Sequence, residues 1–159
     1  MATDPAPSTL DRPSAYVGRR LLAMTYDLLP VLALWLLLSA VFTVAYTWLG
    51  HHHPRENIAP FSPLQWLLWA SCWAVTGIYA TASWRRGGQT LGMRPWRLRV
   101  EAMDGSVPGR KALWLRYAVA TVSVLAAGLG LWWGWFDRDR LTWHDRASGT
   151  RVVRIPKLG

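Results

Sequence analysis

Three long runs without a charged side chain limit what this chain can fold into. They cover residues 28–49, 63–84 and 117–136. Each reaches the roughly 20 apolar residues that a helix needs to cross the hydrocarbon core of a bilayer. Pro30 lies in the expected first turn of the first run, and Ser62 and Pro63 suit the N-cap and first position of the second. The sequence therefore predicts an all-α membrane protein, a small bundle with three transmembrane segments.

The distribution of basic residues predicts which connections face the cytoplasm. The formal net charge is +9, and Lys and Arg gather up to residue 20, between residues 85 and 111, and after residue 137. Residues 51–62 contain one Arg and one Glu. By the positive-inside rule, the N-terminus and the second connection lie in the cytoplasm. Because the basic residues flank apolar runs, we expect the lipid bilayer as a partner, anionic lipid at the cytoplasmic face, and no nucleic acid.

The third apolar run creates a conflict, because a plain crossing would place the basic C-terminal tail outside. The stretches "WRLRVEA" and "TRVVRI" predict two short strands, which would share one side of the membrane if they pair. The stretch "AAGLGLWWG" (residues 126–134) carries glycines that can break a helix within a membrane. A broken or re-entrant third segment would reconcile the charges, and a plain crossing stays open as the alternative.

The N-terminal stretch "MATDPAPSTLDRPSAY" is polar and rich in Pro. We expect residues 1–16 to form a disordered tail and residues 17–159 to form one membrane domain. The run after Asp27 is longer than the apolar region of a signal peptide and has no clear cleavage site. We therefore expect an uncleaved membrane anchor.

Asp27 stands at the entrance to the first run, where a carboxylate is costly and marks a functional residue by default. Arg20 lies seven positions earlier and so projects from the same helix face, although the two are too far apart along the helix to be neighbours. Arg116, at the start of the third run, is the expected basic partner of Asp27. A structural ion pair and a functional carboxylate both fit this pattern.

The other chemical candidates are weaker. His144 beside Asp145 could suggest a general base, but adjacent side chains do not face each other, and no activated nucleophile accompanies them. We therefore expect no catalytic residues and no enzyme activity, and Asp145 is expected to pair with an arginine. The histidines at 51–53 predict a solvated loop, and the lone Cys72 excludes a multi-Cys metal site. We expect no metal and no cofactor.

Three motifs, in order, resemble those of the RDD family of small, mostly bacterial membrane proteins. They are "RRLLAMTYD", "GGQTLGMRPWRLRVEAMDG" and "FDRDRLTWHDRASGTRVV". The family is named for an Arg and two Asp, and the matching positions here are Arg20, Asp27 and Asp145. The chain departs from the family pattern at Met93, often Lys, and at Ser148, often Ala. The resemblance covers nearly all of the chain after residue 16 and implies a bacterial cytoplasmic membrane location.

The resemblance also implies a function. The family is thought to act in transport, and some members are proposed to be sodium–proton antiporters. We therefore expect a transporter of small ions that exchanges cations and protons through an intramembrane carboxylate, and a homo-oligomer, because three short segments cannot easily enclose a pathway. The alternative is a non-transporting module for assembly or for binding a partner or anionic lipid. The implied site is Arg20, Asp27 and Asp145, supported by Arg116, His144, Gly88, Thr90 and Gly92.

Overall fold

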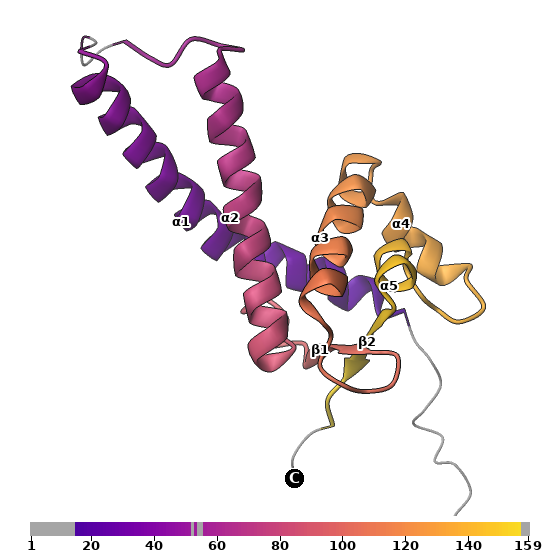
Figure 1. Ribbon diagram of the computed structural model, residues 1–159. Helices are drawn as coiled ribbons and strands as arrows, with labels where there is room; N and C mark the ends of the chain where they lie inside the picture. Colours follow the sequence, from indigo (N-terminus) through magenta and orange to yellow (C-terminus); the bar gives the residue numbers. More distant parts are fainter. Residues whose placement is uncertain (1–14, 52, 54–55, 157–159) are drawn as a thin grey trace, which may run out of the picture.

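The computed structural model describes residues 15–51, 53 and 56–156. Most of the predicted tail, and part of the 51–53 histidine stretch, lie outside the described residues. The chain is mostly helical, with one small sheet (Figure 1). Its elements in order are α1 (Val17–Leu49), α2 (Pro63–Gly87), β1 (Leu98–Ala102), α3 (Arg110–Leu125), α4 (Leu129–Trp132), the 3-10 helix η1 (Trp133–Trp135), α5 (Trp143–Ser148) and β2 (Thr150–Arg154).

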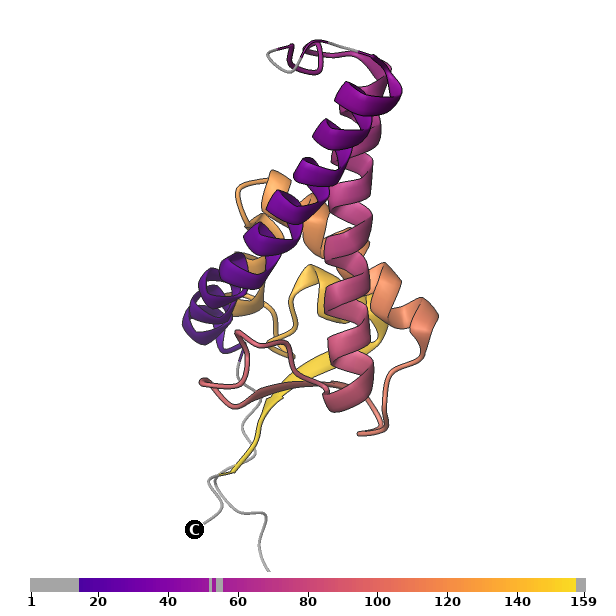
Figure 2. The same ribbon diagram turned by 90° about the vertical axis from the view of Figure 1, so that its left-hand side faces the viewer.

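Helix α1 begins at Val17 rather than at Leu28, so the charged residues before the apolar run belong to the helix. Pro30 therefore lies inside the helix, and its placement in the first turn was wrong. Proline cannot donate the backbone hydrogen bond of a helix interior, and such sites are where helices kink. Helix α1 changes direction part-way along its length (Figures 1 and 2).

Helix α2 begins as its sequence predicts. Pro63 is its first residue, and the Ser62 hydroxyl accepts a hydrogen bond from the Gln65 amide (3.3 Å). The helix continues past Trp84 to Gly87. Helices α1 and α2 lie against each other near their middles, where the Trp35 indole donates to the Thr76 hydroxyl (2.9 Å).

The third apolar segment is broken, as its glycines predict. Helix α3 begins at Arg110, earlier than the expected Tyr117, and ends at Leu125. Gly128 has a φ of 77°, a left-handed conformation that glycine adopts readily, and the axis turns by 108° between α3 and the α4–η1 segment. Among the described residues, α1 alone is long and apolar enough to span a membrane, and the bent pair passes the same test only when taken together.

The predicted strands pair. Strands β1 and β2 are antiparallel, with Leu98 opposite Arg154 and Val100 opposite Val152. Leu98, Val100 and Val152 are buried against Leu113 of α3 and Ala23 of α1. The sheet, α5 and the start of α1 therefore gather at one end of the molecule, and the connection between α1 and α2 lies at the other (Figure 1).

Candidate functional site

A buried carboxylate ties three helices together at the sheet end. Asp145 is in the first turn of α5, where it forms a capping box with Thr142. Its side chain is 0% exposed and accepts from Arg20 Nη2 of α1 (2.7 Å) and Arg116 Nη1 of α3 (2.5 Å). The Thr142 amide donates to the same carboxylate (3.2 Å). The prediction that Asp145 pairs with an arginine is confirmed, and two arginines share it.

The charges in this cluster stabilise the ionised aspartate. Burial alone would raise the pKa of the Asp145 carboxyl, but Arg116 and Arg20 together outweigh burial and hold that pKa well below its usual range. Arg20 also donates to the Thr142 hydroxyl (3.1 Å), and Arg116 to the Thr150 hydroxyl (2.7 Å). Two guanidiniums and one carboxylate leave the cluster with a net charge of +1.

His144 completes the cluster as a neutral side chain. Burial, followed by the positive charge of Arg116, lowers the pKa of His144 to about 3. Its Nε2 lies 3.3 Å from Arg20 Nη1. Because a guanidinium only donates, Nε2 must be the acceptor, and the proton of the neutral ring is then on Nδ1. His144 and Asp145 both contact Arg20, so their juxtaposition positions an arginine.

Asp27 is held by a different set of groups. Its carboxylate accepts from the Tyr79 hydroxyl (2.8 Å), the Thr90 hydroxyl (2.5 Å) and the Gly92 amide (2.8 Å). All three donors are uncharged. The prediction that Arg116 is the partner of Asp27 was wrong, because Arg116 is paired with Asp145, and no other arginine among residues 15–51, 53 and 56–156 forms an ion pair with Asp27. The loop after α2 folds back over α1 and supplies two of the three donors.

The glycines singled out in this loop position it against α1. A Cβ on Gly92 would collide with the Ala23 carbonyl oxygen and lie 2.7 Å from the Asp27 carboxyl carbon. Only a residue without a side chain brings its amide this close to Asp27. Gly88 caps α2, and its carbonyl accepts from the Val100 amide of β1 (2.7 Å), which joins the loop to the sheet.

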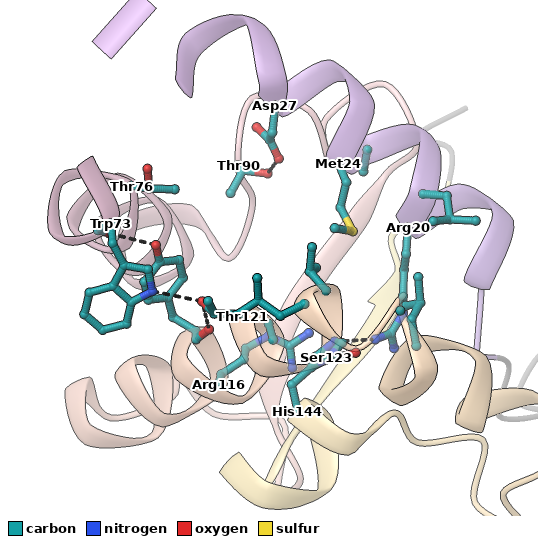
Figure 3. Close-up of a pocket in the computed structure, with 18 of the residues that line it drawn as sticks. Arg20, Met24, Asp27, Trp73, Thr76, Thr90, Arg116, Thr121, Ser123 and His144 are labelled. Atoms are coloured by element: carbon teal, nitrogen blue, oxygen red, sulfur yellow. Dashed lines mark hydrogen bonds between the residues drawn. The ribbon is translucent and has the colours of Figure 1, made fainter. Parts of the chain in front are cut away.

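Asp27 and the side chains around Asp145 line one large cleft. It has a volume of about 1050 Å³ and lies between α1, α2, α3 and α4. Asp27 and Thr90 lie at one side, and Arg116 and His144 lie across from them (Figure 3). Trp35, Trp69 and Trp73 also line the cleft and are partly exposed.

The sequence matches the model of a known protein family. A family model described as the RDD family matches residues 14–149, nearly the whole chain. The chain belongs to the RDD family. This confirms the resemblance drawn from the three sequence motifs and makes the chain a membrane protein.

One curated relative of this RDD protein is the achromobactin transport system permease protein CbrC of Dickeya dadantii (strain 3937). The two are 36% identical over 87 residues, which is 46% of this chain and 25% of the relative. The RDD chain thus matches only about a quarter of that protein's length. No solved structure matches the chain.

The three residues implied by the RDD name fall into two sites. Arg20 and Asp145 pair directly. Asp27, two turns further along α1, accepts hydrogen bonds from α2 and from the loop that follows it. Sequence reasoning missed Tyr79 and Thr150. The one feature of the sequence that could have indicated Tyr79 as a site residue is its hydroxyl group within an apolar run. No local pattern marks Thr150 as a partner of Arg116.

Proposed function

We propose that this RDD protein crosses the bacterial cytoplasmic membrane more than once, with its N-terminus and C-terminal tail in the cytoplasm. Helix α1 would span the bilayer. Helix α2 is less apolar than α1, but its residues 63–84 carry no charge, and we propose that it crosses back beside α1. The bent α3–α4 segment would enter and return on one side. Two observations support this topology. The β1–β2 pair joins the second connection to the tail, and both stretches are rich in Lys and Arg.

Within that topology, we propose exchange of a small cation for a proton at Asp27. The observation that carries the proposal is the separation of charges. Both cluster arginines pair with Asp145, and the donors to Asp27 within the described part of the chain are all uncharged. A carboxylate without a cationic side-chain partner can accept either a proton or a metal cation.

The groups around Asp27 suit a hard cation such as sodium. Hard cations take oxygen ligands, and the carboxylate lies beside the hydroxyl oxygens of Tyr79 and Thr90. Each hydroxyl donates to the carboxylate in this arrangement, and rotation about its C–O bond would present an oxygen lone pair instead. When a cation binds the carboxylate, the two hydroxyl groups would turn their hydrogens away from it, and a proton that binds Asp27 would displace the cation.

The relative named as a transport system permease supports a role in transport without specifying the ion. Asp27 lies on the wall of the cleft, so a small ion can reach it from there. A pathway through the full bilayer would need more surface than this chain encloses, and we propose that a homo-oligomer supplies it.

Reconstitution tests the proposal directly. Proteoliposomes that contain a pH-sensitive dye should show proton movement on a sodium pulse, and Asp27→Asn should abolish it. Asn keeps the size of the side chain and an oxygen for the Gly92 amide, so the variant is expected to fold. Asp139→Asn, at a side chain that is 70% exposed, is the matched control and should retain full flux.

A second candidate is a non-transporting membrane module for assembly, and the Arg20–Asp145–Arg116 cluster favours it because it locks three helices together. The two candidates predict different outcomes. If the folded wild type moves no protons with sodium, lithium or potassium, transport is wrong. Proton movement that persists in Asp27→Asn would refute Asp27 as the exchange site.

Cysteine labelling tests the topology. In a Cys72→Ala background, Arg154→Cys on β2 and Asn57→Cys on the first connection give one thiol each. The proposed topology predicts that a membrane-impermeant maleimide labels intact cells only at position 57. Labelling at position 154 before permeabilisation would instead indicate a plain third crossing.

A further inference from the structure

The cleft carries an unusual set of unused hydrogen-bond donors. Four of the residues that line it have a buried side-chain N–H group without an acceptor among the described residues. The atoms are Arg20 Nε, Arg116 Nε, His144 Nδ1 and Trp84 Nε1. The three members of the Asp145 cluster among them are at least nine-tenths buried. Because a buried donor left unpaired is costly, this set indicates a built acceptor site.

Three of the side chains that carry these donors, Arg20, Arg116 and His144, lie together at one end of the cleft (Figure 3). Arg116 is 5.4 Å from the centre of the Trp84 ring and 2.5 Å from Asp145, which Arg20 also contacts. His144 lies against Arg20. The group is cationic overall, because Asp145 neutralises one of its two arginines. One anionic group with several oxygen acceptors would complement both its charge and its hydrogen bonding.

The rest of the cleft is apolar and long. From Arg20 to Ser39 its wall follows α1 for about 28 Å at 1.5 Å per residue, more than one leaflet of a bilayer whose core is about 30 Å thick. Side chains from α2 and α3, among them Leu68, Ala120 and Val124, form the facing walls. The volume of about 1050 Å³ is at or above the upper limit of the roughly 300–1,000 Å³ of small-molecule sites.

We propose that the cleft binds an anionic phospholipid of the bilayer. Its phosphate would contact Arg20, Arg116, His144 and Trp84, and an acyl chain would lie along the apolar walls. A water molecule, at about 30 Å³, or a free phosphate would satisfy the donors but leave the walls uncovered. Asp27, on the same wall of α1, repels an anion and so confines the headgroup to the arginine end.

The site does not depend on cation exchange at Asp27. It requires only the cleft, its cationic end and a membrane environment. Loss of sodium–proton exchange in Asp27→Asn would therefore leave lipid binding in place, and loss of lipid binding would leave Asp27 and its three donors intact. The two proposals can fail separately.

Native mass spectrometry of the full chain in a nonionic detergent tests the proposal. Delipidated protein is titrated with phosphatidylglycerol and, separately, with phosphatidylcholine of the same chains. We expect one phosphatidylglycerol to bind at least tenfold more tightly than phosphatidylcholine. Inorganic phosphate at the same concentrations should not displace it. Equal binding of the two lipids, or displacement by phosphate alone, would overturn the proposal.

Two variants locate the site without breaking the Asp145 cluster. Trp84→Phe keeps a ring beside Arg116 but removes one N–H donor, and should weaken phosphatidylglycerol binding about three- to tenfold. Ala120→Phe fills the apolar wall and should weaken it at least tenfold. The matched controls, Trp48→Phe and Ala70→Phe at exposed positions outside the cleft, should bind as wild type. Unchanged binding in both cleft variants would overturn the proposal.

Discussion

Removal of the Asp145 charge should strongly destabilise this RDD protein. The Asp145→Asn change keeps the shape of the side chain and an oxygen for the Thr142 amide, so the helix cap of α5 survives. It removes the negative charge from between two guanidiniums whose side chains are 7% and 4% exposed. Breaking a buried ion pair by removing one partner costs about 3–5 kcal/mol, because a charge stays buried without compensation. We expect a loss of that size, since two arginines lose their partner together.

The assay is thermal unfolding in detergent, followed by circular dichroism. For a chain of this length, 1 kcal/mol shifts the midpoint by about 2–4 °C, so Asp145→Asn should lower it by about 6–20 °C. Asp139→Asn is the control. Asp139 pairs with Arg146 at side-chain exposures of 70% and 57%, and such surface pairs contribute about 0–1 kcal/mol. The control should melt within about 2 °C of wild type.

The size of the Asp145→Asn effect tests whether the cluster is buried and charged as described. A midpoint within 2 °C of wild type would mean that the two arginines do not depend on Asp145. A second variant separates charge from packing. Adding Arg20→Met to Asp145→Asn removes one of the stranded cations and should recover part of the lost stability.

Three further predictions address the surroundings of the two acids. Gly92→Ala should disrupt the Asp27 site, since its Cβ would collide with the backbone of α1, and sodium-driven proton movement should fall at least tenfold in proteoliposomes. Tyr79→Phe removes one donor to Asp27 and should shift the pH dependence of that movement, whereas an unchanged profile would exclude Tyr79 from the site. Stability should fall as the pH is lowered from about 6.5 toward 3. In that range His144 takes up a proton in the unfolded chain, but its pKa of about 3 keeps it neutral in the folded protein. His144→Gln should make the fall shallower in thermal melts between pH 7 and 4.

Local patterns predicted the elements of this fold. Ser62 and Pro63 mark the start of α2 because capping depends on residues next to each other in sequence. The glycines around Gly128 mark the break after α3, and β-branched residues mark the two strands that pair. The apolar run 28–49 marked only part of α1, which begins at Val17 and so includes Arg20 and Asp27, the two residues whose spacing places them on one helix face.

The partners of the two acids could not be read from the chain. The donors to Asp27 lie 52, 63 and 65 positions away, and nothing local records that the loop after α2 folds back on α1. The number of charged residues in the sequence also could not show whether Asp27 or Asp145 would bind the arginines. Both arginines pair with Asp145 because it is fully buried and needs compensation most. The RDD resemblance named the residues but not their division into two sites.

Sodium-induced proton release distinguishes the two acids, because Asp27 should exchange a proton for sodium while Asp145 stays paired with Arg20 and Arg116. Purified protein in weakly buffered detergent receives sodium chloride, with choline chloride as the control, and the pH is recorded. At a pH where Asp27 is protonated before sodium is added, wild type should release up to one proton per sodium bound, and correctly folded Asp27→Asn should release none. Proton release that persists in folded Asp27→Asn would mean that another group exchanges the proton.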